Sequence, residues 1–155
     1  MADIVDNRSE IEEDTLSGRY LKYKVGDEHY GIEIKYVTEI INIPQISKVP
    51  GLPHYLKGII NLRGSIIPVM DVRLRFNIEE IEYNDHTCLI ITNIDGMDIA
   101  LIVDSVSEVL SIPDENIIPP PDTKKSGNKF VRGIGKAGEN ILMLLDYQRL
   151  IDVGF

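Results

Sequence analysis

The segment Lys57–Arg73, which reads KGIINLRGSIIPVMDVR, constrains the fold more than any other part of the chain. Two apolar runs flank the tetrapeptide Asn61–Gly64, a pattern that predicts two strands joined by a tight turn. Gly64 supplies the backbone freedom that such a turn needs, and Arg63 beside it presents a fork of hydrogen-bond donors suited to a carboxylate. Pro68 lacks a backbone donor, which predicts an edge strand or a bulge. The segment is therefore a predicted β-hairpin with a charged tip, although an arginine at such a tip is more often a solvated surface residue.

The same alternation of short apolar runs and turns continues along the chain. The other predicted strands are Tyr20–Val25, His29–Ile34, Thr38–Ile43, Thr87–Asn93, Met97–Val103, Val106–Ile112, Phe130–Gly135 and Asn140–Leu145. Asp71 and Asp146 follow apolar runs and are suited to cap short helices. About ten short strands with so little helix predict an all-β protein, built either as a sandwich or as barrels.

The segment Lys57–Arg73 resembles the signature of the CheW family, the scaffold proteins of bacterial chemotaxis. Further segments resemble the family in the same order and spacing: Tyr30–Ile34, Val37, Glu39, Ile40, Ile102–Val106 and Glu108–Leu110. The resemblance covers the chain from Leu21 to Ile151. It implies an all-β fold of two small five-stranded SH3-like barrels packed on a shared apolar core, with short helices.

The sequence also suggests how the chain is divided. Residues 1–15 carry six acidic groups and little periodicity, which predicts a flexible acidic tail. The resemblance implies that residues 16–155 form a single CheW-like domain. Within it, the two barrel subdomains are expected at approximately 16–85 and 86–155, and strands can be exchanged between them.

Composition argues against several classes of function. Sixteen basic and 25 acidic residues give a net charge of −9 and a pI near 4.8, whereas nucleic-acid binding needs a basic surface. For that function, the four cations Lys124, Lys125, Lys129 and Arg132 would have to join a larger basic face. The start of the chain lacks a secretory signal, and no apolar run approaches the ~20 residues of a membrane span. We therefore predict a cytoplasmic protein that binds no nucleic acid and does not insert into a membrane.

Few residues have the arrangement that catalysis requires. The single cysteine, Cys88, excludes an internal disulfide and lies in a predicted strand, which is typical of a buried, inert thiol. The three histidines are widely spaced and match no metal-ligand pattern. Asp71 and Asp104 each follow an apolar strand and are interpreted as turn or cap residues. Because no nucleophile elbow or phosphate-binding loop is present either, we predict no enzyme, no catalytic residue, no cofactor and no metal.

A protein-binding module fits the pattern better, because short strands leave edges that partners can occupy. The CheW family binds chemoreceptors and the histidine kinase CheA. The resemblance implies that the surface used by these two partners includes Val37, Glu39, Gly58 and Arg63. We hypothesise that Glu39 and Arg63 each pair with a charge on a partner helix or, failing that, with each other. Gly58 would let a partner backbone approach, although it can equally end the preceding turn. Val109 also matches a contact position of the family, although a strand valine is more often a core residue.

The function implied by the resemblance is that of a non-catalytic chemotaxis scaffold. Such a protein couples methyl-accepting chemoreceptors to the histidine kinase CheA and allows the receptors to control the kinase. Its implied partners are the regulatory domain of CheA and the cytoplasmic receptor tip, with the scaffold a monomer alone and part of a ring or array in complex. Two alternatives stay open: a CheW-like module of another two-component or CheV-type pathway, and a small ligand-binding or nucleic-acid-binding β-barrel.

Overall fold

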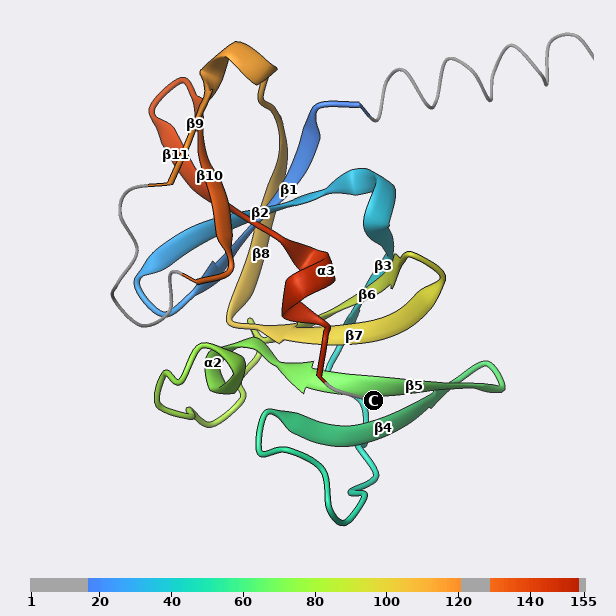
Figure 1. Cartoon of the computed structure of the whole chain (residues 1–155). Coiled ribbons are helices and arrows are strands. Elements are labelled where there is room, and N and C mark those ends of the chain that lie inside the picture. The colour runs from blue at the N-terminus through green and yellow to red at the C-terminus, as the bar shows by residue number, and fades with distance from the viewer. Residues whose placement is uncertain (1–16, 121–128, 154–155) are drawn as a thin grey trace, which may run out of the picture.

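The computed structural model describes residues 17–120 and 129–153, and the predicted acidic tail therefore lies outside the described residues (Figure 1). The described part is mainly β-structure, which confirms the all-β prediction. Its strands are β1 (Arg19–Val25), β2 (Glu28–Glu33), β3 (Val37–Asn42), β4 (Leu56–Leu62), β5 (Ser65–Asp71), β6 (Cys88–Ile94), β7 (Met97–Val103), β8 (Ser105–Ser111), β9 (Ile117–Ile118), β10 (Val131–Ala137) and β11 (Asn140–Leu145). Its helices are single turns: η1 (Ile34–Tyr36), α2 (Val72–Arg75), η2 (Asp114–Asn116) and α3 (Tyr147–Leu150).

The strands form two sheets. Sheet A has the order β8-β1-β2-β11-β10-β9, and sheet B has the order β3-β6-β7-β5-β4. In both sheets the two outermost strands follow one another in the chain. In sheet B the segment after β3 returns to β4, where Ser47 and Ile59 exchange two backbone hydrogen bonds of 2.9 Å. Sheet B is therefore curled, so that the chain after its first strand, β3, is bonded to its last strand, β4.

Each sheet takes strands from both sides of the expected boundary near residue 85. The hairpin β1–β2 lies in sheet A between β8 and β11, and the hairpin β6–β7 lies in sheet B between β3 and β5. In Figure 1 the strands of sheet A occupy the upper part of the view and most of sheet B the lower part.

The predicted hairpin of Lys57–Arg73 is confirmed as β4–β5. Its two turn residues, Arg63 and Gly64, both have positive φ angles, of 50° and 89°. Positive φ at both central residues is the type I′ turn, whose twist matches that of paired strands. Asn61 fixes the turn further, because its Oδ1 accepts a hydrogen bond of 2.9 Å from the Gly64 backbone N–H. The arginine is therefore held at the tip by local backbone geometry.

The prediction from Pro68 was only partly right. β5 is not an edge strand, because it lies between β4 and β7. Ile59, opposite Pro68, uses its N–H and C=O for Ser47, so Pro68 needs no donor on the β4 side. On the other side, pairing with β7 starts only at Val69. The missing donor thus falls in the part of an interior strand where no ladder bond to β7 is made.

The two aspartates expected to cap helices do so. The side chain of Asp71 accepts a hydrogen bond from Arg73 N at the start of α2, and that of Asp146 accepts one from Arg149 N at the start of α3. Both helices are a single turn long, as expected of short helices.

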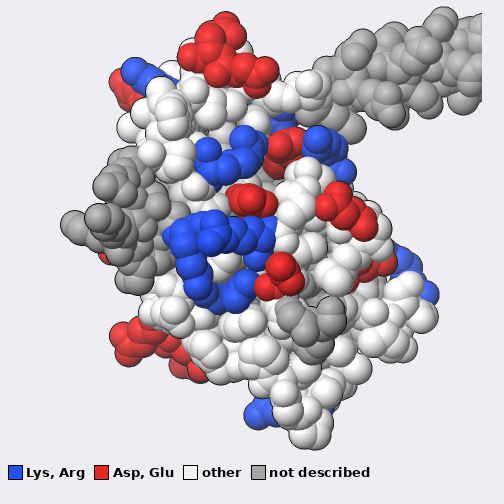
Figure 2. All heavy atoms as spheres, viewed as in Figure 1, with Lys and Arg blue, Asp and Glu red and all other residues white. Residues whose placement is uncertain are grey.

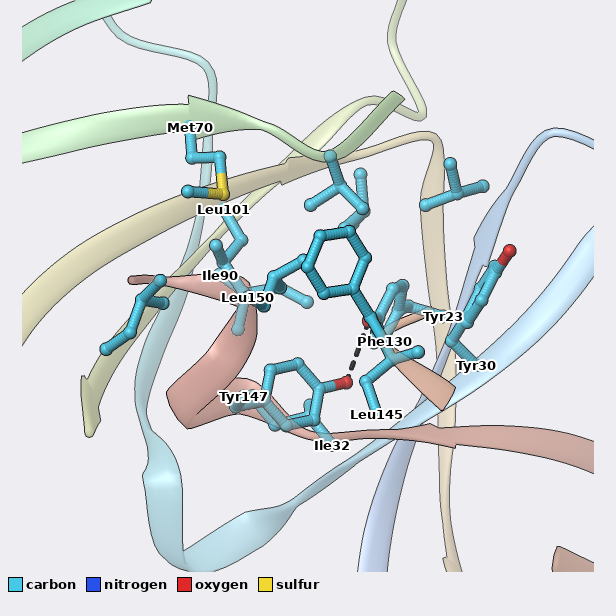
Figure 3. Packing of buried hydrophobic residues seen from close by; sticks show 14 of the residues in the cluster. Tyr23, Tyr30, Ile32, Met70, Ile90, Leu101, Phe130, Leu145, Tyr147 and Leu150 are labelled. Carbon is cyan, nitrogen blue, oxygen red and sulfur yellow. Dashed lines mark hydrogen bonds between the residues drawn. The ribbon is translucent and has the colours of Figure 1, made fainter. Parts of the chain in front are cut away.

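The main apolar core is shared by the two sheets. It joins Tyr23, Tyr30, Ile32 and Leu145 of sheet A to Met70, Ile90 and Leu101 of sheet B, and it also includes Phe130, Tyr147 and Leu150 (Figure 3). The hydroxyl groups of Tyr23 and Tyr147 are hydrogen-bonded at 2.8 Å. Because Tyr147 Oη donates its proton to the Gly31 carbonyl at 2.9 Å, Tyr23 is the donor between the two hydroxyls. Buried hydroxyls are costly unless bonded, and these two are satisfied. The predicted shared apolar core is therefore confirmed, because one cluster of buried residues packs the two sheets against each other.

Candidate protein-binding surface

Arg63 and Glu39 form an ion pair between the tip of the β4–β5 hairpin and strand β3. The Arg63 side chain is 71% exposed and that of Glu39 is 28% exposed. The structure therefore brings together two of the predicted binding residues. Of the two hypotheses for these charges, the one realised within the chain is that they pair with each other.

A β-bulge places Glu39. Strand β3 pairs with β6, and the register shifts between Val37 and Glu39, so that Thr38 has no partner of its own. An extra residue of this kind bends the strand and re-aims the side chains that follow. Val37, before the bulge, is half-buried and packs against the shared core. Of these two predicted site residues, Glu39 offers its charge to the surface and Val37 anchors the strand.

A shallow groove of about 290 Å³ surrounds the ion pair. We call it the β3–β4 groove; it is lined by Thr38, Glu39, Leu62, Arg63, Ser65, Ile67, Ile91 and Asp98. An exposed ion pair contributes only about 0.2–1 kcal/mol to stability. A partner charge therefore competes with the internal pair at little cost.

Gly58 is buried, and the structure gives it another role. Its φ is +143°, and a Cβ placed on it would lie 2.1 Å from the Ser47 carbonyl oxygen. A backbone does approach this glycine, as expected of a strand glycine, but it belongs to residue 47 of the same chain. Gly58 therefore allows the backbone at Ser47 to pack closely against strand β4.

Val109 lies on β8 in sheet A, and its side chain is 39% exposed. It pairs with Leu21 beside another register shift of the sheet. Glu39 and Arg63 belong to sheet B, so Val109 lies on the other sheet from this ion pair.

An apolar groove lies at the far edge of sheet A. Its volume is about 520 Å³, and we call it the β9–β11 groove; its lining is Glu115, Asn116, Ile118, Ile134, Lys136, Gly138 and Ile141. Ile118 is 58% exposed and Ile141 is 62% exposed, so two large apolar side chains face solvent in one groove. Sequence analysis did not single out this groove. Its only signal was the alternation in Asn140–Leu145, which places Ile141 on the face opposite the buried Leu142 and Leu144.

Asp71 and Asp104, interpreted from the sequence as turn or cap residues, both accept hydrogen bonds within the chain. Asp104 accepts two hydrogen bonds from Arg73, Nε at 2.8 Å and Nη2 at 2.7 Å, and a third of 2.8 Å from Gly26 N. Asp71 caps α2 and accepts a 2.8 Å bond from Tyr83 Oη, while its burial raises the pKa of its carboxyl group. Both carboxyl groups therefore accept hydrogen bonds from other residues of the same chain. Cys88, expected to be buried, is half-buried, and its Sγ lies 3.2 Å from the His86 carbonyl oxygen, to which it donates.

Charged residues of both signs share the surface. Figure 2 shows basic side chains in a band across the visible face, with acidic side chains directly beside them. Arg132 pairs with Glu33 at 3.1 Å, and Lys129 lies over the Phe130 ring at 5.0 Å. Lys124 and Lys125 lie outside the described residues. Two of the four cations weighed for nucleic-acid binding are thus engaged locally.

The described residues lack two further features that would point to other functions. In residues 17–120 and 129–153, no group of three or more His, Cys, Asp or Glu side chains is placed to hold a metal ion. In the same ranges, no helix has the length and apolar character needed to cross a bilayer. The features of the surface are an exposed ion pair on a hairpin and an apolar groove on the other sheet. The fold and these features together place the chain in the class of small all-β proteins with exposed surface grooves.

Comparison with known proteins identifies the family. A family model for the CheW-like domain matches residues 19–154. The chemotaxis protein CheW of Klebsiella aerogenes is 33% identical over 144 residues, which cover 92% of this chain and 87% of that protein. The chemotaxis protein CheW of Treponema pallidum is 30% identical over 133 residues, covering 83% and 78%. The crystal structure of the scaffolding protein TtCheW from Thermoanaerobacter tengcongensis matches with a TM-score of 0.82 at 35% identity, covering 88% of this chain and 94% of that one. The chain belongs to the CheW family.

Proposed function

We propose that this protein is a non-catalytic chemotaxis adaptor that couples methyl-accepting chemoreceptors to the histidine kinase CheA. The observation that carries the proposal is the family match over residues 19–154, joined to an exposed ion pair that offers both charges to a partner. The relatives named above are chemotaxis proteins, and the structural neighbour is described as a scaffolding protein. In this function the protein positions the receptor and the kinase relative to each other and contributes coupling free energy between them. The catalytic reaction is that of the kinase.

Bridging two partners requires two separate surfaces. The β3–β4 groove offers charges at its rim, and the β9–β11 groove offers apolar area of the kind found at the centre of interfaces. The two grooves belong to different sheets, so one partner need not exclude the other. We propose that one surface takes the regulatory domain of CheA and another takes the cytoplasmic receptor tip. The protein then acts in the cytoplasm, as a monomer recruited to receptor arrays by its partners.

Calorimetric titration with the isolated regulatory domain of CheA from the same organism tests the proposal. We expect saturable one-to-one binding by the wild type. If the β3–β4 groove faces the kinase, Arg63→Ala and Glu39→Ala will each weaken binding roughly tenfold, which corresponds to about 1.4 kcal/mol. Equal binding by wild type and both variants would assign the pair to the receptor side or to no interface.

Lys57→Ala is the matched control. Lys57 lies on β4, the first strand of the hairpin that carries Arg63, and makes an exposed ion pair with Glu80. Neither Lys57 nor Glu80 lines the β3–β4 groove. Its removal should leave binding unchanged. No heat and no co-elution of wild type with the kinase domain at high micromolar concentration would reject the coupling function.

A further inference from the structure

Arg75, on the single turn of α2, lies against two aromatic rings. Its guanidinium carbon is 4.5 Å from the centre of the Tyr55 ring and 4.8 Å from the centre of the Phe130 ring. Tyr55 is half-buried and Phe130 is buried, so both contacts are partly shielded from water. A guanidinium group is attracted to the face of an aromatic ring, and more strongly where water is excluded. The two rings therefore hold the guanidinium group in place.

The same guanidinium group bonds the end of α3. Its Nε donates to the Leu150 carbonyl at 2.9 Å. Its Nη2 donates to the Asp152 carbonyl at 3.1 Å and to the Arg149 carbonyl at 3.4 Å. The last carbonyls of a helix have no partner within the helix, and a basic side chain can satisfy them. Arg75 thus combines ring stacking with a fork of directed hydrogen bonds, which a lysine does not reproduce.

These contacts connect the bases of two hairpins. The base of the β4–β5 hairpin is closed by a 2.8 Å bond from Asp71 N to the Tyr55 carbonyl, and α2 follows directly. The base of the β10–β11 hairpin is closed by a 2.7 Å bond from Asp146 N to the Phe130 carbonyl, and α3 follows it. Arg75 touches both closing aromatic residues and the end of α3. It therefore links a hairpin of sheet B directly to a hairpin of sheet A.

Each of these hairpins carries part of one groove. Arg63 of the β3–β4 groove lies on the β4–β5 hairpin, and Ile141 of the β9–β11 groove lies on the β10–β11 hairpin. The shared core holds the two sheets together by apolar burial, which is not directional. A planar guanidinium group that stacks and donates in fixed directions restricts orientation as well. Arg75 itself lines neither groove.

We propose that Arg75 is a positioning residue, which fixes the orientation of the β4–β5 hairpin relative to the β10–β11 hairpin and so sets the geometry between the two grooves. The consequence for binding rests on the proposed function. Two partners held in two grooves are positioned relative to each other only as precisely as the two hairpins are.

The distance between two spin labels tests this proposal without any partner. Nitroxide labels are attached at Ser65→Cys and Glu139→Cys, exposed sites at the tips of the two hairpins, with the single native cysteine removed by Cys88→Ser. Pulsed electron double resonance should give a narrow distance distribution when Arg75 is present. We expect Arg75→Met, which keeps an apolar stem but no fork, to broaden the distribution roughly twofold. Arg75→Lys should give an intermediate width.

Lys129→Met is the matched control. Lys129 also lies over the Phe130 ring, at 5.0 Å, and its removal leaves the contacts of Arg75 in place. The distance distribution of this variant should therefore match that of the protein with Lys129. If Arg75→Met leaves the distribution equally narrow, even with a lower unfolding midpoint, Arg75 only stabilises the fold and the proposal is overturned. Arg75→Lys decides the question in the same way if Arg75→Met does not fold.

Binding measurements test the consequence for coupling. We expect Arg75→Met to bind the isolated regulatory domain of CheA, or a receptor-tip fragment, within about twofold of wild type. Its affinity for the second partner in the presence of the first should fall by roughly fivefold or more. Equal affinity of variant and wild type for the second partner would overturn the role of Arg75 in coupling. Failure of the wild type to bind either partner would instead reject the proposed function, and the spin-label distances would still decide whether Arg75 orients the hairpins.

Discussion

At the scale of single residues, Gly58 leaves less room for a side chain than any other glycine in the described part of the chain. We expect Gly58→Ala to destabilise the protein by about 2–4 kcal/mol, because the added Cβ overlaps the Ser47 carbonyl and the positive φ is strained for alanine. Urea unfolding followed by circular dichroism measures the loss. Since Ser47 and Ile59 are held by two backbone hydrogen bonds, the backbone cannot move aside without breaking them.

Gly138→Ala is the matched control for backbone strain alone. Gly138 also has a positive φ, +61°, but nothing lies within 4 Å of the position of its added Cβ. This variant should cost about 1–2 kcal/mol. If both alanine variants lose the same stability, the steric overlap at Ser47 is not what makes Gly58 necessary.

Asp71 makes stability depend on pH. Burial raises the pKa of its carboxyl group above the usual value of 3.8, so the folded protein holds the proton more tightly than the unfolded chain does. The stability contributed by this group is therefore fully present below pH 3.8 and is lost as the pH rises through the higher folded pKa. We expect Asp71→Asn, which can still cap α2, to be relatively more stable at pH 7 than at pH 4, each time compared with wild type.

Urea unfolding at the two pH values measures this difference. Asp146→Asn is the control, because Asp146 caps α3 in the same way but is less buried. Its stability relative to wild type should change less between pH 4 and pH 7. If the stability of Asp71→Asn relative to wild type is the same at both pH values, burial of Asp71 does not raise the pKa of its carboxyl group.

At the scale of elements, the Arg73–Asp104 pair fastens α2 to the β1–β2 turn. Both side chains are mostly buried, with 15% and 18% of their surface exposed, and Asp104 also accepts from Gly26 N. Asp104→Asn leaves the arginine without its counter-charge, and we expect a loss of about 2–4 kcal/mol in the free energy of unfolding. Arg73→Lys keeps the charge but loses the two-pronged contact, so its loss should be smaller.

Lys35→Ala provides the comparison for an exposed ion pair. Lys35 bonds Glu33 at 3.1 Å but keeps 57% of its side chain exposed, so its removal should cost less than about 0.5 kcal/mol. The three variants can be compared in one series of denaturant titrations. A loss for Asp104→Asn no larger than that for Lys35→Ala would show that the buried pair does not fasten these elements.

Elements set by neighbouring residues could be predicted from the sequence, and those set by distant residues could not. The turn at Arg63 and Gly64 and the cap at Asp71 depend on local geometry, and both are confirmed. An alternating apolar pattern gives a strand two faces but does not name its neighbours. The pairing of β1 with β8, and the interior place of the strand with Pro68, therefore appear only in the structure.

The candidate site was predictable to the same degree. The charges of Glu39 and Arg63 can be found in the sequence, but their contact depends on the curl of sheet B, which brings β3 toward the β4–β5 turn. Exposure is also a tertiary property. For this reason the exposed Ile118 and Ile141 were missed, while the buried Gly58 was included.

At the scale of the whole molecule, the shared core predicts one unfolding transition. The chain has seven tyrosines and no tryptophan, and Tyr23, Tyr30 and Tyr147 lie in the cluster that joins both sheets. Tyrosine fluorescence and far-UV circular dichroism should therefore give the same midpoint in urea. Two separate midpoints would contradict the single core and favour sheets that unfold independently.

The long reach of the sheet A pairings affects how the protein is made. Tyr30 lies beside Met143 in the finished sheet, so the first hairpin leaves the ribosome well before its neighbour exists. At about 5–20 residues per second, that interval is roughly 5–20 seconds. Meanwhile its tyrosine and leucine side chains have no core to enter, so they stay exposed on the nascent chain, where exposed apolar surface promotes aggregation. The first strands to be synthesised are thus among the last that can find their place.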